Sequence, residues 1–252
     1  MAPEPLWLPP PTDLALSSDE VHVWRASLDL PVSRVQSMQH ILTADELRRA
    51  ERFHFQKHRQ RFVVARGLLR IILGRYLDIE PNQLRFCYSD YGKPSLSTPG
   101  QEALSFNLSH SGGLALYAVT RNREVGIDLE RIRTDFEHAQ IAEQFFSPRE
   151  NTVLQALPVS LKPEAFFTCW VRKEAYIKAR GEGLSLPLDQ FDVSLAPGEP
   201  AILLNTRGDS QEANRWSLRE LSPGPGYAAA LAVKGHGWRL ACWQWPERVL
   251  SP

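Results

Sequence analysis

Two neighbouring acidic residues have a spacing that suits a divalent metal ion. They belong to the segment Val125-Gly126-Ile127-Asp128-Leu129-Glu130, which has the alternation of a strand. Side chains on a strand alternate between its two faces, so we expect Asp128 and Glu130 to lie together on the face opposite the apolar residues. Paired carboxylates repel each other unless a cation lies between them, and such oxygen ligands suit Mg²⁺. A solvated strand edge with acidic outward positions is the alternative interpretation.

A third carboxylate, Glu174, lies within an apolar helical pattern. It follows Phe167 and Trp170 and precedes Ile177 at intervals of three or four residues, the spacing of one helix face. A buried carboxylate without a partner is costly, and binding a metal ion would remove that cost. Lys178, one turn further on, is placed to reach a phosphate. An exposed pair of Glu174 with Lys178, worth about 0.2–0.5 kcal/mol, is the alternative, but it leaves the flanking apolar residues unexplained.

Glu150 has a structural explanation of its own. The segment Ser147-Pro148-Arg149-Glu150 is typical of a helix N-terminus. In such a capping box, the glutamate at the third helical position accepts a hydrogen bond from the backbone of the cap residue. The sequence pattern alone therefore gives no reason to assign catalysis to this residue.

Basic residues offer contacts for a phosphorylated ligand. Nine lysines and arginines lie between residues 48 and 75, and guanidinium groups match phosphate oxygens well. A solvated helix face is the alternative for most of them. Lys93 is presented by a predicted turn, and His110 follows a predicted strand and precedes glycines, where ligand contacts are common. The formal net charge of zero argues against nucleic-acid binding.

These residues must be positioned by a mixture of helices and strands. Alternating apolar residues predict strands at 21–28, 104–108, 114–119 and 125–130. Capping and three-to-four-residue periodicity predict helices at about 43–53, 62–76, 137–157 and 163–180, followed by short C-terminal strands.

A faint internal repeat indicates two similar halves. The segment at 111–119 resembles the segment at 224–233, and long helices precede the second copy as they precede the first. We therefore predict an α+β fold in which two similar α/β halves, each with a small sheet packed on helices, have a pseudo-twofold arrangement. The predicted halves are 1–125 and 126–252, with a site between them.

The overall composition is that of an ordinary soluble protein. Of 252 residues, 43% are hydrophobic and 23% are charged, which is enough for a substantial core. The three cysteines are far apart in apolar surroundings, a pattern that favours a reducing compartment. No secretory leader or run of about twenty apolar residues occurs, so we expect a cytoplasmic protein without membrane contact.

Three motifs in order resemble the phosphopantetheinyl transferases. They are Gly-Ile-Asp-x-Glu at 126–130, Phe-Phe-Ser-x-x-Glu at 145–150 and Trp-x-x-Lys-Glu-Ala-x-x-Lys at 170–178. Segments at 91–94, 107–111 and 183–188 resemble the surfactin-type subfamily, and the surroundings of Trp24 resemble cyanobacterial members. The resemblance implies transfer of the 4'-phosphopantetheine group of coenzyme A to a serine of an apo acyl or peptidyl carrier protein, with release of 3',5'-adenosine bisphosphate.

The resemblance also implies roles for individual residues. The metal ligands for Mg²⁺ would be Asp128, Glu130 and Glu174. The contacts to coenzyme A, the co-substrate, would be made by Lys93, Ser109, His110 and Lys178. Its 3'-phosphate would be bound by Arg49 and Arg61, although this chain has Glu46 where related sequences often have a lysine.

The base that removes the serine proton would be Glu174 or Glu150, while magnesium, Lys178 and His110 would neutralise phosphate charge. We expect a monomer, because both halves of the site belong to one chain. A magnesium-dependent phosphohydrolase and a non-catalytic coenzyme A-binding module are the alternative functions, but neither explains the ordered motifs.

Overall fold

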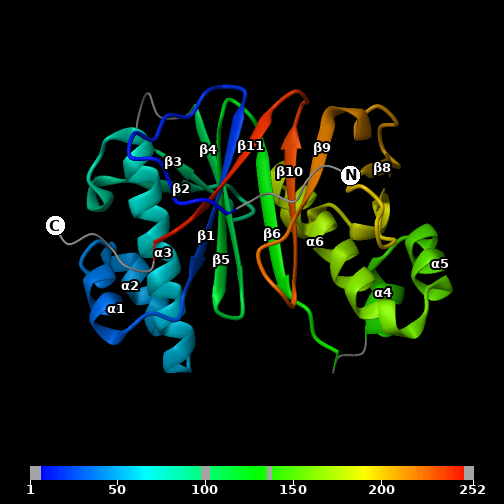
Figure 1. Ribbon diagram of the computed structural model, residues 1–252, viewed down its shortest axis with the longest axis horizontal. Helices are drawn as coiled ribbons and strands as arrows, with labels where there is room; N and C mark the ends of the chain where they lie inside the picture. Colours follow the sequence, from blue (N-terminus) through cyan, green and yellow to red (C-terminus); the bar gives the residue numbers. More distant parts are fainter. Residues whose placement is uncertain (1–6, 98–102, 135–137, 247–252) are drawn as a thin grey trace.

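Two β-sheets lie side by side between two groups of helices in the computed structural model, which describes residues 7–97, 103–134 and 138–246 (Figure 1). The strand order is β11-β1-β5-β4 in the first sheet and β6-β10-β9 in the second. The first sheet consists of β1 (Glu20–Ser27), β4 (Leu104–Ser111), β5 (Leu114–Arg121) and β11 (Arg239–Gln244). The second consists of β6 (Val125–Arg131), β9 (Trp216–Leu221) and β10 (Tyr227–Lys234).

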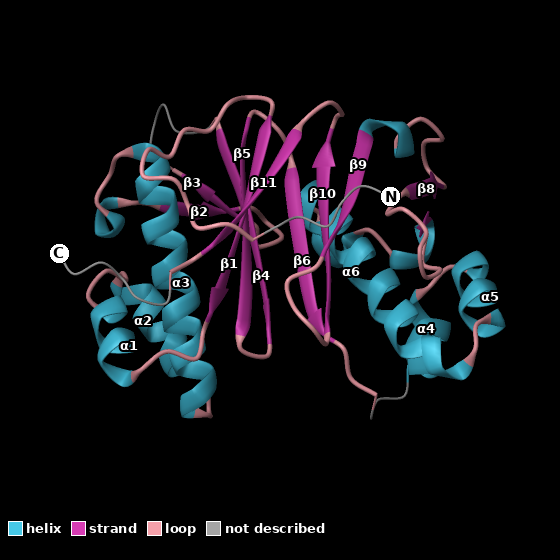
Figure 2. Cartoon of the chain, in the orientation of Figure 1, coloured by secondary structure: helices cyan, strands magenta, loops and turns pink. Residues whose placement is uncertain are grey.

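Helices cover the outer face of each sheet (Figure 2). The helices beside the first sheet are α1 (Val32–Gln39), α2 (Ala44–Glu51) and α3 (Gln56–Leu77). Those beside the second are α4 (His138–Phe145), α5 (Pro148–Ala156) and α6 (Lys162–Arg180). Each half also has a two-stranded ribbon, made by β2 (Phe86–Tyr88) with β3 (Pro94–Leu96) and by β7 (Phe191–Val193) with β8 (Leu203–Thr206).

Three apolar clusters hold these layers together. One lies between the first sheet and α3, one between the second sheet and α6, and the third between the two sheets. The third contains Val23 and Ala118 from the first sheet with Ile127 and Leu129 from the second, all completely buried. Because a sheet with both faces covered needs apolar residues on both, most positions of β1, β5 and β6 are buried. The predicted fold of two α/β halves is confirmed.

The last strand, β11, belongs to the predicted second half, 126–252, but it lies in the sheet of the first half. β11 pairs in parallel with β1, with Val23 opposite Cys242, and so completes the sheet of the first half. The internal repeat, in contrast, has a clear structural counterpart. β5 lies in the interior of its sheet between β1 and β4, and β10 lies between β6 and β9.

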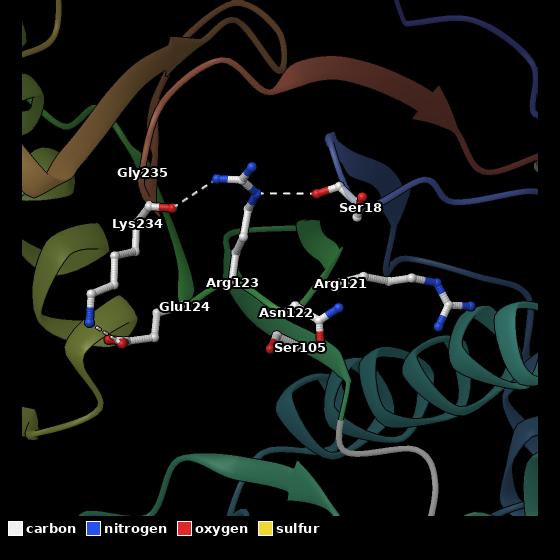
Figure 3. Close-up of a pocket in the computed structure, with 8 residues that line it drawn as sticks. All are labelled: Ser18, Ser105, Arg121, Asn122, Arg123, Glu124, Lys234 and Gly235. Carbon is white, nitrogen blue, oxygen red and sulfur yellow. Dashed lines mark hydrogen bonds and ion pairs between the residues drawn. The ribbon is translucent and has the colours of Figure 1, made fainter.

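The chain passes from one sheet to the other at residues 122–124, where side chains fasten the crossing (Figure 3). Arg123 Nε donates to the carbonyl oxygen of Ser18 at 3.2 Å, and one terminal nitrogen donates to that of Lys234 at 3.3 Å. The Lys234 ammonium pairs with Glu124. The cationic side chains of Arg123 and Lys234 are thus engaged in contacts within the protein. The acidic motif residues line a separate hollow.

Candidate active site

The acidic motif residues meet in one hollow between the two halves. It is lined by Leu108, Ser109, His110, Asp128, Glu130, Trp170, Glu174 and Lys178. These residues come from β4, β6 and α6, so each of the two sheets contributes to the site. The structure thus brings together six of the residues that the sequence predicts for the site. The other four, at positions 49, 61, 93 and 150, do not line it.

The acids of β6 lie opposite the apolar residues, as predicted. Ile127 and Leu129 belong to the core between the sheets, whereas Asp128 and Glu130 face the hollow beside α6. Asp128 is 3% exposed, and its Oδ2 atom is buried without a hydrogen-bond partner. A buried carboxylate oxygen without a partner is costly, and a cation would remove that cost.

Gly126 lets α6 approach β6 closely enough to form the site. A β-carbon at this position would lie 2.1 Å from the carbonyl oxygen of Ala175 and 2.3 Å from the backbone nitrogen of Ala179. Any side chain would therefore strike the helix backbone itself. The same helix presents Glu174 and Lys178 to the hollow, so the glycine of the motif allows the two sets of acids to face each other.

Lys178 supplies the positive charge nearest to the acids. Its ammonium donates to Asp128 Oδ1 at 2.6 Å and to Ser109 Oγ at 3.1 Å. The Ser109 hydroxyl donates in turn to Asp128 Oδ1 at 2.8 Å. Ser109 therefore fixes both a carboxylate and an ammonium group, in addition to its predicted position at the coenzyme A site.

Burial, with crowding of negative charge as a lesser cause, raises the pKa of two of the acids. For Glu174, burial raises the pKa above its ordinary value, and the negative charges of Asp128 and Glu130 add to this effect. For Glu130, burial is again the largest cause, followed among the raising effects by Asp128, while a hydrogen bond from Ser111 opposes the rise. A cation bound between these carboxylates would therefore relieve their mutual repulsion and lower both pKa values.

His110 lies on β4 itself rather than after it, because the pairing with β5 continues to Ser111. This corrects the predicted end of the strand near residue 108. Although much of the side chain reaches solvent, partial burial of the ring lowers the pKa of His110, and the charges of Lys178 and Arg61 lower it further. The imidazole is thereby kept largely neutral near pH 7, where it can donate a hydrogen bond or accept one.

The donor set fits Mg²⁺ in chemical type. This hard cation accepts carboxylate oxygens as ligands, with water and phosphate completing its shell. One carboxylate oxygen of the site is buried without a hydrogen-bond partner, and two of the carboxyl groups have raised pKa values. Within the described ranges, no three His, Cys, Asp or Glu side chains are already close enough together to hold a metal ion. In this structure, the positive charge beside Asp128 is that of the Lys178 ammonium, 2.6 Å from Oδ1.

Glu150 lies outside the hollow and has a structural role. Both of its oxygens are occupied: Oε2 accepts from the backbone N–H of Ser147 at 2.9 Å, and Oε1 accepts from that of Val193 at 2.8 Å. The carboxylate also pairs with Lys173 at 2.8 Å, and both side chains are essentially inaccessible. The predicted capping box is present. The alternative catalytic role is not supported, because no exposed oxygen is left to accept a substrate proton.

Lys93 is engaged at the junction of the halves. Its ammonium donates to the carbonyl oxygens of Ala179 at 2.8 Å and Val125 at 3.2 Å, next to the contact made by Gly126. Burial lowers the pKa of Lys93 to about 8. Lys93 does not line the hollow, so a contact with coenzyme A would require the ligand to extend to the β2–β3 turn.

The two predicted arginines differ in availability. Arg61 makes a bidentate pair with Asp29, with both N···O distances at 2.7 Å. Arg49 is exposed, packs over the ring of Phe62 and makes no ion pair within the described part of the chain. Glu46 is buried and pairs with Arg66 and with Arg70. The guanidinium groups of Arg66 and Arg70 thus neutralise the Glu46 carboxylate.

Comparisons with known proteins bear on the family of this chain. Residues 24–122 match the family model described as "4'-phosphopantetheinyl transferase, N-terminal", and residues 124–232 match that of the "4'-phosphopantetheinyl transferase superfamily". The 4'-phosphopantetheinyl transferase HetI of Nostoc sp. is 47% identical over 95% of this chain and 98% of its own length. The chain belongs to the 4'-phosphopantetheinyl transferase family.

The family assignment settles the class of reaction. The 4'-phosphopantetheinyl transferase Sfp of Bacillus subtilis is 31% identical over 67% of this chain and 74% of its own length. The predicted resemblance to surfactin-type and cyanobacterial transferases is thereby confirmed. The protein is an enzyme that transfers the phosphopantetheine group of coenzyme A to a carrier protein. None of the described helices is long and apolar enough to span a membrane.

Proposed function

We propose that this transferase is magnesium-dependent and that it modifies the serine of an apo acyl or peptidyl carrier protein, releasing 3',5'-adenosine bisphosphate. The observation that supports the metal is the convergence of Asp128, Glu130 and Glu174, with one buried carboxylate oxygen lacking any partner. When bound there, Mg²⁺ would supply neutralisation of pyrophosphate charge. The enzyme is proposed to act as a cytoplasmic monomer.

The remaining side chains of the hollow would orient coenzyme A. The Lys178 side chain is 30% exposed, so its ammonium can reach a phosphate while remaining close to Asp128. His110 can donate to a phosphate oxygen from the wall formed by β4. Transfers of this kind depend mainly on positioning and on neutralising charge rather than on covalent chemistry by the protein. Arg49, exposed and without an ion pair to any described residue, is the better placed of the two arginines for the 3'-phosphate.

Glu174 is the proposed base for the carrier serine. It lies in the hollow, whereas the alternative, Glu150, is buried in its own ion pair. Its raised pKa makes it a better proton acceptor than an ordinary glutamate. In this proposal the hydroxyl of the carrier serine gives its proton to the Glu174 carboxylate. The serine oxygen then forms a bond to the β-phosphorus of coenzyme A, and the phosphoanhydride bond to the leaving 3',5'-adenosine bisphosphate breaks.

Intact mass spectrometry of apo carrier proteins tests this function. We expect a gain of about 340 Da on the carrier when protein, coenzyme A and Mg²⁺ are present, and none with a chelator. Asp128→Asn should abolish the gain, whereas Arg149→Gln, a change at an exposed helix position outside the hollow, should leave it intact. A gain that persists in excess chelator would refute the metal requirement. Acyl and peptidyl carriers assayed in parallel identify which class is modified.

A further inference from the structure

Strands β4 and β6 lie next to each other although they belong to different sheets. No backbone ladder joins them, and each is an edge strand of its own sheet. Side chains of β4 take the place of the missing ladder. Asn107 Oδ1 accepts from the backbone N–H of Ile127 at 2.9 Å. Ser109 Oγ accepts from that of Leu129 at 3.3 Å, and Ser111 Oγ accepts from that of Arg131 at 3.0 Å. We call these three contacts the polar seam.

The polar seam also determines where the Ser111 hydroxyl proton points. A serine hydroxyl has one proton to donate and lone pairs to accept with. Since Ser111 Oγ accepts from the backbone of Arg131, its own proton is free for another acceptor. It is donated to Glu130 Oε2 at 2.7 Å. An ionised carboxylate can only accept, so this hydrogen bond fixes one oxygen of Glu130 and leaves the other available to a ligand.

We propose that Ser111 is a positioning residue that holds Glu130 as a metal ligand. This inference rests on the proposed function, because it requires that Glu130 binds Mg²⁺. Outer groups that hold a ligating side chain contribute to metal affinity, and their removal typically weakens it about 10- to 100-fold. Ser109 makes the equivalent contact to Asp128 at 2.8 Å, but it also contacts Lys178, so Ser111 isolates the positioning role more cleanly.

The seam contains its own control residue. Asn107 lies on the same side of β4 as the two serines and accepts a hydrogen bond from the backbone of β6 as they do. Its side chain makes no hydrogen bond to a described carboxylate. A change at Asn107 therefore weakens the contact between the halves without releasing an acid. A change at Ser111 weakens the same kind of contact and also releases Glu130.

Direct measurement of metal binding distinguishes the two effects. Mn²⁺ prefers carboxylate and water ligands as Mg²⁺ does, and electron paramagnetic resonance reports its free concentration. We expect Ser111→Ala to weaken Mn²⁺ binding by the full protein about 10-fold, and Ser111→Thr, which keeps the hydroxyl, to restore it. Asn107→Ala, which removes the acceptor oxygen, should lower the melting temperature with unchanged Mn²⁺ affinity. If Ser111→Ala does not fold, Ser111→Cys, which has only a weak S–H donor, replaces it.

Each result has one meaning. Unchanged Mn²⁺ affinity in the folded Ser111 variant would overturn the inference while leaving the metal site intact. Equal weakening by the Asn107 variant would also overturn it, since the effect would then come from the contact between strands. If the unmodified protein bound no Mn²⁺ at all, the proposed metal dependence would fail first, and the role of Ser111 would fail with it.

Discussion

Replacing Gly126 by alanine should force strand β6 and helix α6 apart. The new β-carbon would lie 2.1 Å from the carbonyl oxygen of Ala175, whereas real β-carbons are essentially never found closer than 3.0 Å to such atoms. The helix would have to move by at least ~0.9 Å, the difference between these two distances. The obstructing atoms belong to the backbone, so no side-chain rotation can relieve the contact.

Both stability and catalysis should suffer from this displacement. Overpacking of a close-packed interior costs about 1–3 kcal/mol, and in a protein of this size each kcal/mol lowers the melting temperature by about 2–4 °C. The shift also moves Glu174 and Lys178 away from Asp128, because they lie on the displaced helix. Misplacement of catalytic groups by about 1 Å can cost roughly 100-fold in rate.

Thermal unfolding and the carrier-modification assay test the two effects on the same sample. Gly208→Ala is the matched control, because a β-carbon there meets no atom within 4 Å and its backbone is not in the left-handed region. We expect Gly126→Ala to melt about 2–12 °C lower and to transfer about 100-fold more slowly, with the control unchanged. A Gly126→Ala protein that melts and turns over like the control would refute this account of the glycine.

Two further predictions concern buried charge. Glu150→Gln removes the partner of the inaccessible Lys173 and should destabilise the protein by about 3–5 kcal/mol in denaturant unfolding; normal stability with lost turnover would restore the catalytic role. The second concerns Glu130 and Glu174, whose pKa values are raised above 4.5 in the folded protein. The metal-free protein should lose stability as the pH rises through those values, since the folded state binds more protons than the unfolded state there. Mg²⁺ should raise the melting temperature above this window and not below it, and an equal effect at both extremes would contradict the assignment.

The sequence predicts the pieces of the site well because they obey local periodicity. Alternation on β6 separates Asp128 and Glu130 from the apolar residues, and helical spacing places Glu174 and Lys178 on one face of α6. The capping box at Ser147 is equally local. Each of these features depends on residues no more than four positions apart, so neither tertiary contacts nor loop geometry were needed to infer them.

Contacts between distant segments could not be inferred in the same way. Glu150 pairs with Lys173, which directly precedes the predicted metal ligand Glu174, yet nothing in the spacing says that the side chains of Glu150 and Lys173 meet. The resemblance predicts Lys93 at the nucleotide, but its ammonium donates to carbonyl groups of β6 and α6. The polar seam did leave one signal, since Asn107, Ser109 and Ser111 alternate on a strand edge and so must face a common neighbour.

The position of β11 bears on how the protein is made. β1 lies between β5 and β11, and it pairs with residues that are about 220 positions further along the chain. During synthesis, the edge of β1 in the first sheet therefore stays unpaired until residues 239–244 have left the ribosome. Such distant pairing slows folding, and an open edge invites pairing with other chains. We expect the nascent first half to depend on chaperones that cover this edge. The strands of the second sheet, β6-β10-β9, in contrast, all come from residues 125–234.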